Sequence, residues 1–385
     1  MKQQRILISG AGIAGLTMAR CLEKLGIDYV IIEKYPDYKV SSSGIALPFN
    51  AVQALRKLDL ADRVLSQAHQ VKRVDYTKSN GDILASASLL ESPLNQDKFI
   101  SLERADLYQA LVEGVKQKVH YNSHIISTKN QESKVTVESN NPEVNGDYDL
   151  IICAEGLESS LRKQCFPSRN TVVDHGICNW RFIVEWRDHG LEPTYMLHHT
   201  ELFMAYPLSK DKLYCYGHIK AEANTAKNAN HLASLKTIFS DFKGPVPMIL
   251  NHLDDSKIHF SQLRSVDQPY YYSDKIIFIG DASNACSPLL QQGAACAFED
   301  ALALSNLLEK VQANHLDFNA LDIGKEFEAA RNKKVDWIVR SSDDPIKLMK
   351  KMKNPLLRFL RNKVIAKKGP LNVQGWRALA QMQDK

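Results

Sequence analysis

The feature that most constrains this chain is a glycine-rich turn between a strand and a helix near the N-terminus. Residues 5–9 predict a short buried strand, and the turn after it reads Gly10-Ala11-Gly12-Ile13-Ala14-Gly15. Apolar side chains at 14, 18, 21, 22 and 25 follow the period of a helix, with Gly26 as its C-cap, and a second apolar strand occupies 29–32. A strand, a helix and a strand within 33 residues predict a parallel α/β sheet that begins here.

The glycine spacing also predicts what the turn binds. Gly10 permits the tight turn, Gly12 lets backbone N–H groups approach a pyrophosphate, and Gly15 allows helix and strand to pack closely. The helix N-terminus then faces the phosphate charge. Glu33 ends the second strand, and a carboxylate at that place accepts hydrogen bonds from an adenosine ribose. The sequence therefore predicts a bound dinucleotide with an unphosphorylated ribose.

Composition excludes several classes of protein. The 385 residues include 49 Lys and Arg and 44 Asp and Glu, and this net charge of +5 does not indicate a nucleic-acid partner. No apolar run approaches the roughly 18 residues that span a bilayer. Residues 1–5 lead directly into the first strand without a signal-peptide region, and the seven cysteines include no CxxC pair. We therefore expect a soluble cytoplasmic protein without a disulfide framework or a metal site.

Two later segments belong to the same predicted sheet. One runs over 149–162 and contains Cys153-Ala154-Glu155-Gly156, and the other reads Ile279-Gly280-Asp281-Ala282 and continues to Gly293. Asp281 would follow a buried strand, at the edge where α/β sheets hold their ligands. Gly293 would open a helix whose N-terminal dipole favours negative charge. One domain is therefore expected to be assembled from separated pieces of chain.

Other elements are expected between these pieces. Helices are predicted at 50–60, 102–115 and 294–308, strands at 135–138, 148–153 and 275–279, and an aromatic, strand-rich region at 176–219.

In this order, the three segments resemble the FAD-dependent monooxygenases of the p-hydroxybenzoate hydroxylase type. Residues 44–51 (Gly-Ile-Ala-Leu-Pro-Phe-Asn-Ala), Arg104 ahead of a helix, Trp180-Arg181 and residues 205–208 (Ala-Tyr-Pro-Leu) extend the resemblance, which covers roughly 5–335. It implies an α/β fold with a Rossmann-like FAD-binding domain of the glutathione-reductase type, an inserted mixed β-sheet substrate domain and a C-terminal helix. The implied divisions are 1–73, 99–172 and 264–340 for the first domain, 74–98 and 173–263 for the second, and 341–385 for a basic helical segment.

The resemblance also implies roles for single residues. The FAD contacts would be Gly10, Gly12, Ala14, Gly15, Glu33, Lys34, Gly44, Arg104, Asp281, Pro288, Gly293 and Ala294, with Pro288 and Asn284 near the place where oxygen reacts. No catalytic side chain is implied, because NADPH or NADH would reduce the flavin transiently and a flavin C4a-hydroperoxide would then hydroxylate the substrate. Two positions depart from the family pattern, since Glu155 replaces an aspartate and Asn284 replaces a histidine.

Substrate residues are expected on the inserted sheet. Strand alternation places Trp180 on one face and Arg181 on the other. The density of aromatic residues here favours a planar, aromatic or polycyclic small molecule. The predicted substrate residues are Trp180, Arg181, Phe203, Tyr214 and His218. Urate and salicylate hydroxylases and tetracycline-inactivating monooxygenases are nearest in pattern. Urate is disfavoured, because Leu202 stands where the urate enzymes carry an arginine. An antibiotic-inactivating monooxygenase of the tetracycline type stays open as an alternative, although no residue specifies tetracycline.

The C-terminal region is basic and apolar at once. Residues 345–368 carry nine Lys and Arg and no Asp or Glu. A helix packed across both domains with its cations snorkelling outward is the favoured interpretation, and a helix at a membrane surface is the alternative. The sequence leaves open whether the protein is a monomer or a homodimer. It also leaves open a reductase or oxidase that acts on a lipophilic substrate without oxygen insertion, and a flavin-binding protein without turnover.

Overall fold

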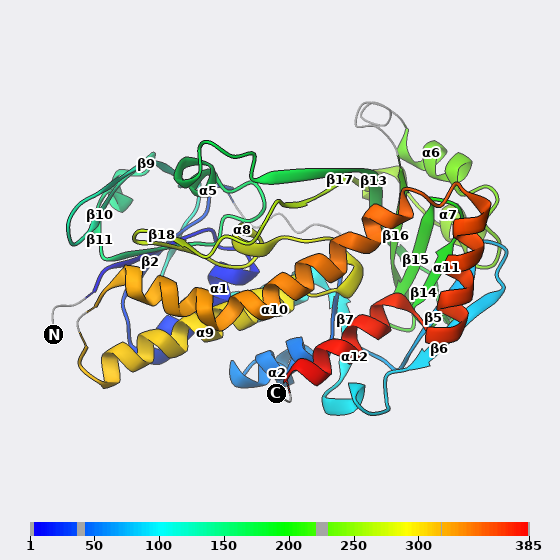
Figure 1. Ribbon diagram of the computed structural model, residues 1–385, viewed down its shortest axis with the longest axis horizontal. Helices are drawn as coiled ribbons and strands as arrows, with labels where there is room; N and C mark the ends of the chain where they lie inside the picture. Colours follow the sequence, from blue (N-terminus) through cyan, green and yellow to red (C-terminus); the bar gives the residue numbers. More distant parts are fainter. Residues whose placement is uncertain (1–3, 37–42, 221–229, 317, 384–385) are drawn as a thin grey trace.

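The computed structural model describes residues 4–36, 43–220, 230–316 and 318–383. Its central sheet has six strands among these residues, five of them parallel, with β18 antiparallel at one edge (Figure 1). The order is β18 (Tyr272–Ser273), β19 (Ile276–Phe278), β12 (Leu150–Cys153), β1 (Ile6–Ser9), β2 (Tyr29–Ile32) and β8 (Val119–His120). The glycine-rich turn follows β1, at the centre of this sheet.

The four inner strands are almost entirely apolar because both faces of the sheet are covered. Ile6 of β1 lies opposite Leu150 on one side and Tyr29 on the other, and all three are buried. Helices cover one face of the sheet, and a small antiparallel sheet with α5 lies on the opposite side (Figure 1). The helices are α1 (Ile13–Leu25), α4 (Arg104–Val112), α9 (Gly293–Ala313) and α10 (Ala320–Met349). The opposite side has α5 (Ser160–Cys165), β9 (Ile125–Asn130), β10 (Val135–Ser139) and β11 (Gly146–Tyr148).

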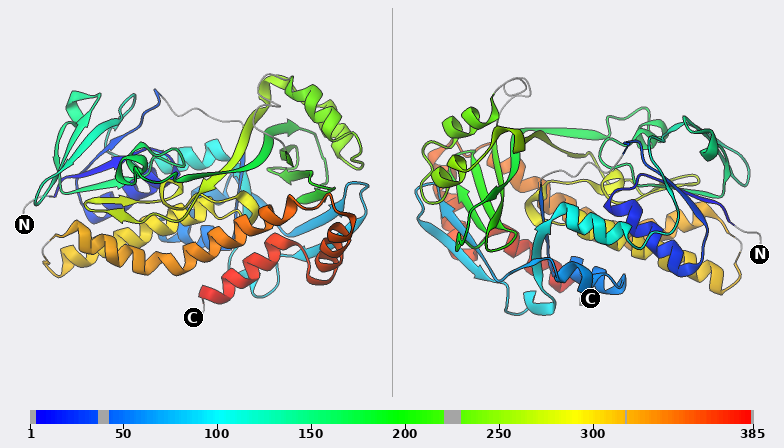
Figure 2. Two further views of the ribbon diagram at one scale, coloured as in Figure 1. Left: turned by 45° about the horizontal axis from the view of Figure 1, so that its top comes forward. Right: turned by 180° about the vertical axis from the view of Figure 1, so that it is seen from behind.

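A second sheet has seven strands in the part of the chain that the structure describes. Its order is β17 (His259–Val266), β13 (Val172–Glu185), β16 (Lys212–Lys220), β15 (Leu202–Pro207), β14 (Thr194–Leu197), β5 (Arg73–Lys78) and β6 (Ile83–Ser88). Only the pairing of β14 with β5 is parallel. The long strands β13 and β17 connect this sheet to the first one (Figure 2). The predicted α/β fold with an inserted mixed sheet is confirmed.

Smaller elements fill the space between and around the two sheets. A three-stranded sheet and two helices lie beside the cavity described below: β3 (Gly44–Leu47), β7 (Phe99–Glu103), β4 (His69–Val71), α2 (Phe49–Lys57) and α3 (Ala61–Leu65). Two helices pack on the outer face of the seven-stranded sheet: α6 (His231–Ile238) and α7 (Val246–Asn251). The short α8 (Asp281–Asn284) follows β19.

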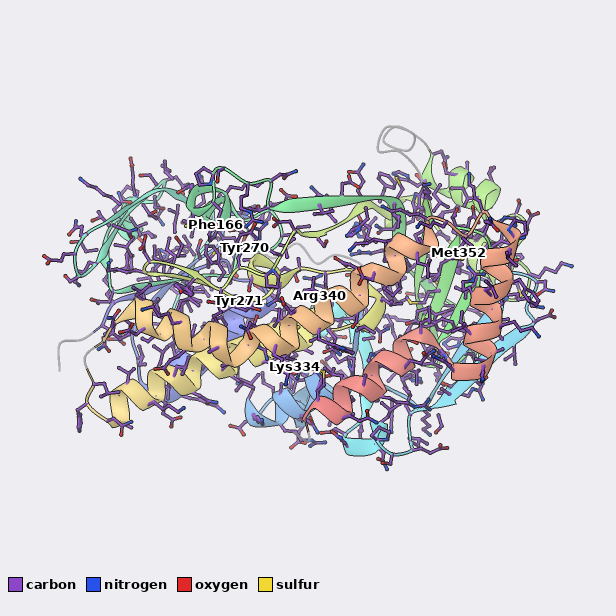
Figure 3. All side chains as sticks on the ribbon, viewed as in Figure 1. Phe166, Tyr270, Tyr271, Lys334, Arg340 and Met352 are labelled. Atoms are coloured by element: carbon purple, nitrogen blue, oxygen red, sulfur yellow. The ribbon has the colours of Figure 1, made fainter. Side chains whose placement is uncertain are left out.

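The C-terminal helices run back along the molecule. The helix α10 extends from the six-stranded sheet to the seven-stranded sheet, and Met352 marks the turn after it (Figure 3). Two further helices, α11 (Pro355–Lys368) and α12 (Leu371–Gln383), then close the same end of the cavity. The division expected at 340/341 falls inside α10, so the C-terminal segment does not begin there as a separate element.

Several predicted bounds differ for local reasons. The helix expected at 102–115 begins at Arg104, because Leu102 is in β7 and pairs with Ile45. The helix expected at 50–60 ends at Lys57, and Asp59 then takes a left-handed conformation with φ of 57°. Residues 148–153 contain the end of β11 and all of β12, which belong to different sheets.

Candidate active site

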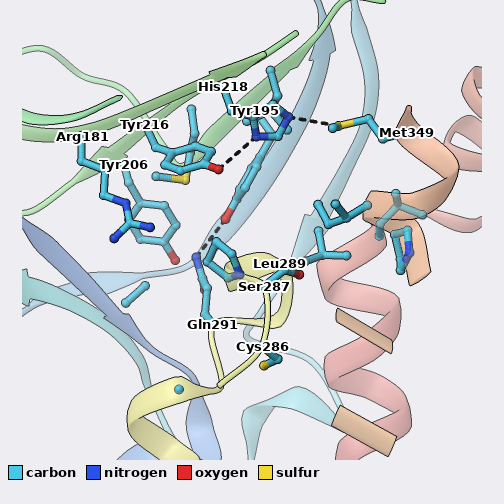
Figure 4. Close-up of a pocket in the computed structure, with 18 of the residues that line it drawn as sticks. Arg181, Tyr195, Tyr206, Tyr216, His218, Cys286, Ser287, Leu289, Gln291 and Met349 are labelled. Atoms are coloured by element: carbon cyan, nitrogen blue, oxygen red, sulfur yellow. Dashed lines mark hydrogen bonds between the residues drawn. The ribbon is translucent and has the colours of Figure 1, made fainter. Parts of the chain in front are cut away.

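A large cavity of about 870 Å³ lies between the two sheets (Figure 4). Its walls come from α1, β3, α9, the seven-stranded sheet, the end of α10 and α11. Eight of the predicted cofactor residues line it: Gly12, Ala14, Gly44, Arg104, Asp281, Pro288, Gly293 and Ala294. Three of the predicted substrate residues line it too: Arg181, Tyr214 and His218. The fold thus brings segments from distant parts of the sequence to one space.

The glycine-rich turn meets three different steric demands. Gly10 has φ of 107°, and a Cβ there would lie 2.4 Å from the carbonyl oxygen of Ala154. A Cβ on Gly15 would lie 1.8 Å from the carbonyl oxygen of Gly10, so helix and strand could not pack as they do. Gly12, in contrast, would meet no protein atom within 4 Å and lines the cavity. A side chain at Gly12 would therefore occupy only space that a ligand needs.

Glu33 lies beside this turn, outside the cavity. Its two carboxylate oxygens accept hydrogen bonds from the backbone N–H groups of Ala11, at 2.9 Å, and Tyr35, at 3.0 Å. The carboxylate is thereby held at the end of β2, where a ribose would lie in a Rossmann-like site. Lys34 is exposed, and its Nζ atom lies 4.9 Å from the centre of the Tyr35 ring, so its predicted cofactor contact has no support in the cavity geometry.

Asp281 and the N-terminus of α9 also line the cavity. A Cβ on Gly293 would lie 3.8 Å from Oδ1 of Asp281, so the carboxylate and the helix start are neighbours. Desolvation inside the protein raises the pKa of Asp281, and the charges of Arg104 and Arg181 oppose this rise. The helix dipole and the two arginines favour anionic groups, while Asp281 accepts hydrogen bonds from hydroxyl groups. This donor and acceptor set fits the pyrophosphate, polyol and ring of a flavin dinucleotide.

Glu155, one of the two residues that depart from the family pattern, forms hydrogen bonds with groups close to it in the structure. Its carboxylate accepts hydrogen bonds from the hydroxyls of Ser9, Ser159 and Ser160 and from the N–H of Leu161, at 2.7 to 3.1 Å. It thereby ties the end of β1 to the first turn of α5. This arrangement satisfies the carboxylate within the protein, beside the cavity residues Ala154 and Gly156.

Asn284, the other departure, does not line the cavity among the described residues. Its Nδ2 atom donates to Oδ2 of Asp300 at 2.9 Å, and the same oxygen accepts the N–H of Gly280. Asp300 is in turn paired with Arg331, whose Nε atom lies 2.7 Å from Oδ1. A buried ion pair thus holds the Asn284 side chain in the core, and its place near the oxygen-reaction site stays a prediction.

The wall that the seven-stranded sheet contributes carries tyrosine hydroxyls and the cation of Arg181 (Figure 4). Arg181 makes no salt bridge with any described residue, and its buried Nε atom has no hydrogen-bond partner there. Its guanidinium carbon lies 5.9 Å from the centre of the Tyr216 ring. Tyr195 accepts a hydrogen bond from Nε2 of Gln291 at 2.8 Å. A positive charge and several phenol groups thus face a space that the protein itself leaves open.

His218 links this wall to the end of α10. Its Nδ1 atom lies 3.1 Å from the hydroxyl of Tyr216, and its Nε2 atom lies 3.0 Å from Sδ of Met349 (Figure 4). Burial lowers the pKa of His218 to about 4, so the imidazole is neutral near pH 7. His218 therefore contributes a fixed neutral hydrogen-bonding group rather than a charge.

Two predicted substrate residues lie on the outer face of the sheet. Trp180 and Phe203 are fully buried and pack in the core that α6 and α7 form on the outer face. Arg181 faces the cavity and Trp180 faces away, as strand alternation predicts. The substrate contacts expected of Trp180 and Phe203 have no support in the cavity geometry, because these side chains hold α6 and α7 to the sheet.

Sequence reasoning missed an apolar wall of the cavity. The turn between α10 and α11 and their adjoining ends supply Ile346, Met349, Met352, Leu357, Leu360, Val364 and Ile365. The sequence shows these apolar residues at helical spacing within the basic segment. It does not show that they line a cavity instead of packing in a core. Leu202 also lines this cavity.

Comparison with known proteins agrees with this geometry. A model of the FAD binding domain family matches residues 3–335. The chain belongs to this family. Similar proteins include a monooxygenase of Bacillus subtilis and a urate hydroxylase of Klebsiella pneumoniae that are both named FAD-dependent. This protein is an FAD-dependent oxidoreductase of the flavin monooxygenase type.

The similar proteins are named for, or were solved with, different compounds. The 2-heptyl-3-hydroxy-4(1H)-quinolone synthase of Pseudomonas aeruginosa is 28% identical over 315 residues, which are 78% of this chain and 80% of that protein. Klebsiella pneumoniae HpxO, solved with FAD and uric acid, matches with a TM-score of 0.86 at 21% identity, over 99% of this chain and 97% of that one. The tetracycline destructase Tet(51) matches with a TM-score of 0.72 at 18% identity, over 98% of both chains.

The residues that line the cavity fit an FAD cofactor. Gly12 leaves room for the pyrophosphate, Asp281 and Arg104 face the cavity, and the start of α9 points its dipole into it. Within the described ranges, no helix has the length and apolar character needed to cross a membrane.

Proposed function

We propose that the protein uses NADPH or NADH and O2 to hydroxylate an aromatic small molecule that carries an apolar extension. The observation that carries this proposal is one continuous cavity, which joins the FAD-binding turn at Gly12 to a phenol-lined polar wall and an apolar wall. Bound FAD would supply oxygen activation and transfer, while the side chains bind and orient the substrate and exclude water.

The polar wall supports an aromatic head group with an oxygen substituent. Arg181 has a free guanidinium N–H and no carboxylate partner among the described residues, so it suits a phenolate or a ring carbonyl. Tyr214 and Tyr216 provide ring faces and hydroxyls beside it. The neutral His218 holds Tyr216 in place without adding charge. Such a wall orients a ring at the edge where the flavin would lie.

The apolar wall supports a substrate that extends beyond one ring. Met349, Met352, Leu357 and Ile365 place flexible and branched side chains around the far part of the cavity. Methionine side chains adapt to irregular apolar ligands. A compact polar substrate such as urate would leave this wall without contacts, and Leu202 gives it no charged partner. The name of the Pseudomonas aeruginosa relative, a heptylquinolone synthase, agrees with such a ring and chain.

The test is oxidation of NADPH and of NADH by purified holoprotein with a panel of compounds. The panel contains phenols, salicylates, urate, tetracyclines, and 4-quinolones with and without a 2-alkyl chain. We expect 2-alkyl-4-quinolones to stimulate cofactor oxidation more than the ring alone does. Equal rates with and without the chain would contradict the apolar extension, and stimulation by tetracycline alone would favour the antibiotic-inactivating alternative.

Labelled oxygen separates hydroxylation from the other flavin chemistry. Product formed under ¹⁸O2 should carry one labelled oxygen atom if the enzyme is a monooxygenase. Product without label would favour a reductase or oxidase acting on a lipophilic compound. FAD retention with no turnover across the panel would leave flavin binding as the supported role.

A further inference from the structure

The outward face of α11 is apolar and cationic, which is unusual for a helix at the surface of a protein. Leu356 is 64% exposed and Phe359 is 57% exposed, and neither lines the cavity. Ile365, which falls on the opposite side of the helix at 3.6 residues per turn, is fully buried. The helical period places Leu356, Phe359, Leu360, Lys363 and Lys367 together on the outward stripe.

The charges around this stripe have one sign. From Pro345 to Lys368 the chain carries nine Lys and Arg and no acidic residue. Among these nine cations, the structure pairs only Lys347 with a carboxylate, that of Asp344. Arg361 is turned inward and donates to the carbonyl oxygen of His198 at 2.9 Å, which anchors the helix to the protein. The outward lysines therefore remain available to an anionic surface.

The helix is also a wall of the cavity. Leu360 and Val364 line the cavity and are 49% and 46% exposed, and α11 stands at the end of the molecule farthest from the six-stranded sheet (Figures 1 and 2). A partner that binds the outward stripe of α11 therefore also contacts the edge of the apolar part of the cavity.

We propose that α11 docks the protein on the surface of an anionic lipid bilayer. Exposed Leu356 and Phe359 would enter the boundary between head groups and acyl chains, and Lys363 and Lys367 would lie against lipid phosphates. Charge complementarity favours a lipid surface over a second copy of this chain, because two copies would bring their lysines together. Docking on the bilayer does not depend on the proposed reaction. Entry of a lipophilic substrate from the bilayer by this route does rest on the proposed function.

The test is sedimentation of holoprotein with vesicles of phosphatidylcholine alone and of phosphatidylcholine with phosphatidylglycerol in equal parts. We expect binding to the anionic vesicles only, and release by added salt. The paired variants Leu356→Ser/Phe359→Ser and Lys363→Glu/Lys367→Glu should each weaken binding by about tenfold or more. Flavin content should stay at the level of the unmodified protein, because none of these four residues lines the cavity.

Matched controls alter exposed residues elsewhere. Met248→Ser/Leu316→Ser removes two exposed apolar side chains, and Lys129→Glu/Lys257→Glu reverses two exposed charges, all outside the C-terminal helices. These pairs should bind vesicles as the unmodified protein does. Absence of binding, or equal losses in the controls and the α11 variants, would overturn the proposal. So would a dimer in sedimentation velocity without lipid that dissociates on Leu356→Ser/Phe359→Ser, which would assign the face to a second copy.

Discussion

The imidazole Nε2 atom of His218 lies 3.0 Å from the sulfur of Met349. This contact joins β16 of the seven-stranded sheet to the last turn of α10. A thioether sulfur has no hydrogen to donate, so Nε2 carries the proton. Nδ1 is then the acceptor for the hydroxyl of Tyr216. One contact thus fixes the tautomer of His218 and the direction of the next hydrogen bond in the cavity wall.

We expect Met349→Leu to destabilise the protein by about 1–3 kcal/mol, because it leaves the buried Nε2–H group of His218 without its acceptor. The measurement is urea unfolding of the holoprotein followed by flavin fluorescence and circular dichroism. Met196→Leu is the matched control, since Met196 is buried in the outer core with no side-chain hydrogen bond among those observed. It should cost less than about 1.5 kcal/mol. Equal losses in the two variants would refute the role of the sulfur.

Stability should fall as the pH drops through the range between 6.5 and about 4, partly because of His218. Its pKa in the folded protein is lowered to about 4, so between these values the unfolded chain binds a proton that the folded protein does not. From pH 7.5 to pH 5 this one group should remove about 2 kcal/mol. His218→Gln should flatten the profile by that amount when unfolding is measured at several pH values. An unchanged slope would show that other groups account for it.

Asp281→Ala should weaken FAD binding by about 10- to 100-fold, because a charged acceptor that faces the cavity is lost. Glu33→Arg should weaken it less, since Glu33 lies outside the cavity beside the ribose end of the turn. Flavin content after gel filtration and titration of the apoprotein with FAD measure both effects. Asp336→Ala, in the exposed pair with Arg340, is the control and should retain flavin fully. Full flavin occupancy in Asp281→Ala would contradict the assignment of this carboxylate.

Adjacent residues 180 and 181 should give opposite phenotypes. Trp180→Ala should lower the free energy of unfolding by about 3–5 kcal/mol, because it opens a cavity in the core under α6 and α7. Arg181→Ala should unfold almost normally and raise the KM of the substrate found in the panel by about tenfold or more. Urea unfolding and steady-state kinetics separate the two effects. A stable Trp180→Ala protein with a raised KM would place Trp180 in the substrate site after all.

Local patterns were enough to predict the elements that hold the cofactor. The turn at Gly10 to Gly15 and the strand before Asp281 depend on residues adjacent in sequence. The structure brings them together where Gly280 packs against Ala14. The periodicity of β13 likewise predicted its two faces. It did not reveal which face meets the cavity, because α6 and α7 decide this from about 50 to 70 residues away.

Other features of the site also depend on contacts distant in sequence. Asn284 is turned inward by Asp300, which belongs to another helix and is held there by Arg331. The apolar wall of the cavity exists because α10 carries the chain back to the seven-stranded sheet before α11 begins. The sequence shows that these side chains are apolar. What they contact depends on where α10 carries the chain.

The course of α10 has a consequence for how this protein can be divided or recombined. Ile323 and Phe327 near its start belong to the core of the six-stranded sheet, and Ile346 near its end packs against Ile177 and Leu263 of the other sheet. Its 30 residues form one helix of about 45 Å. A chimera that exchanged the substrate half with that of a relative would have to cut or re-register this helix. The parts built on the two sheets therefore cannot be exchanged separately. A chimera has to include α10 together with the surfaces that pack against both of its ends.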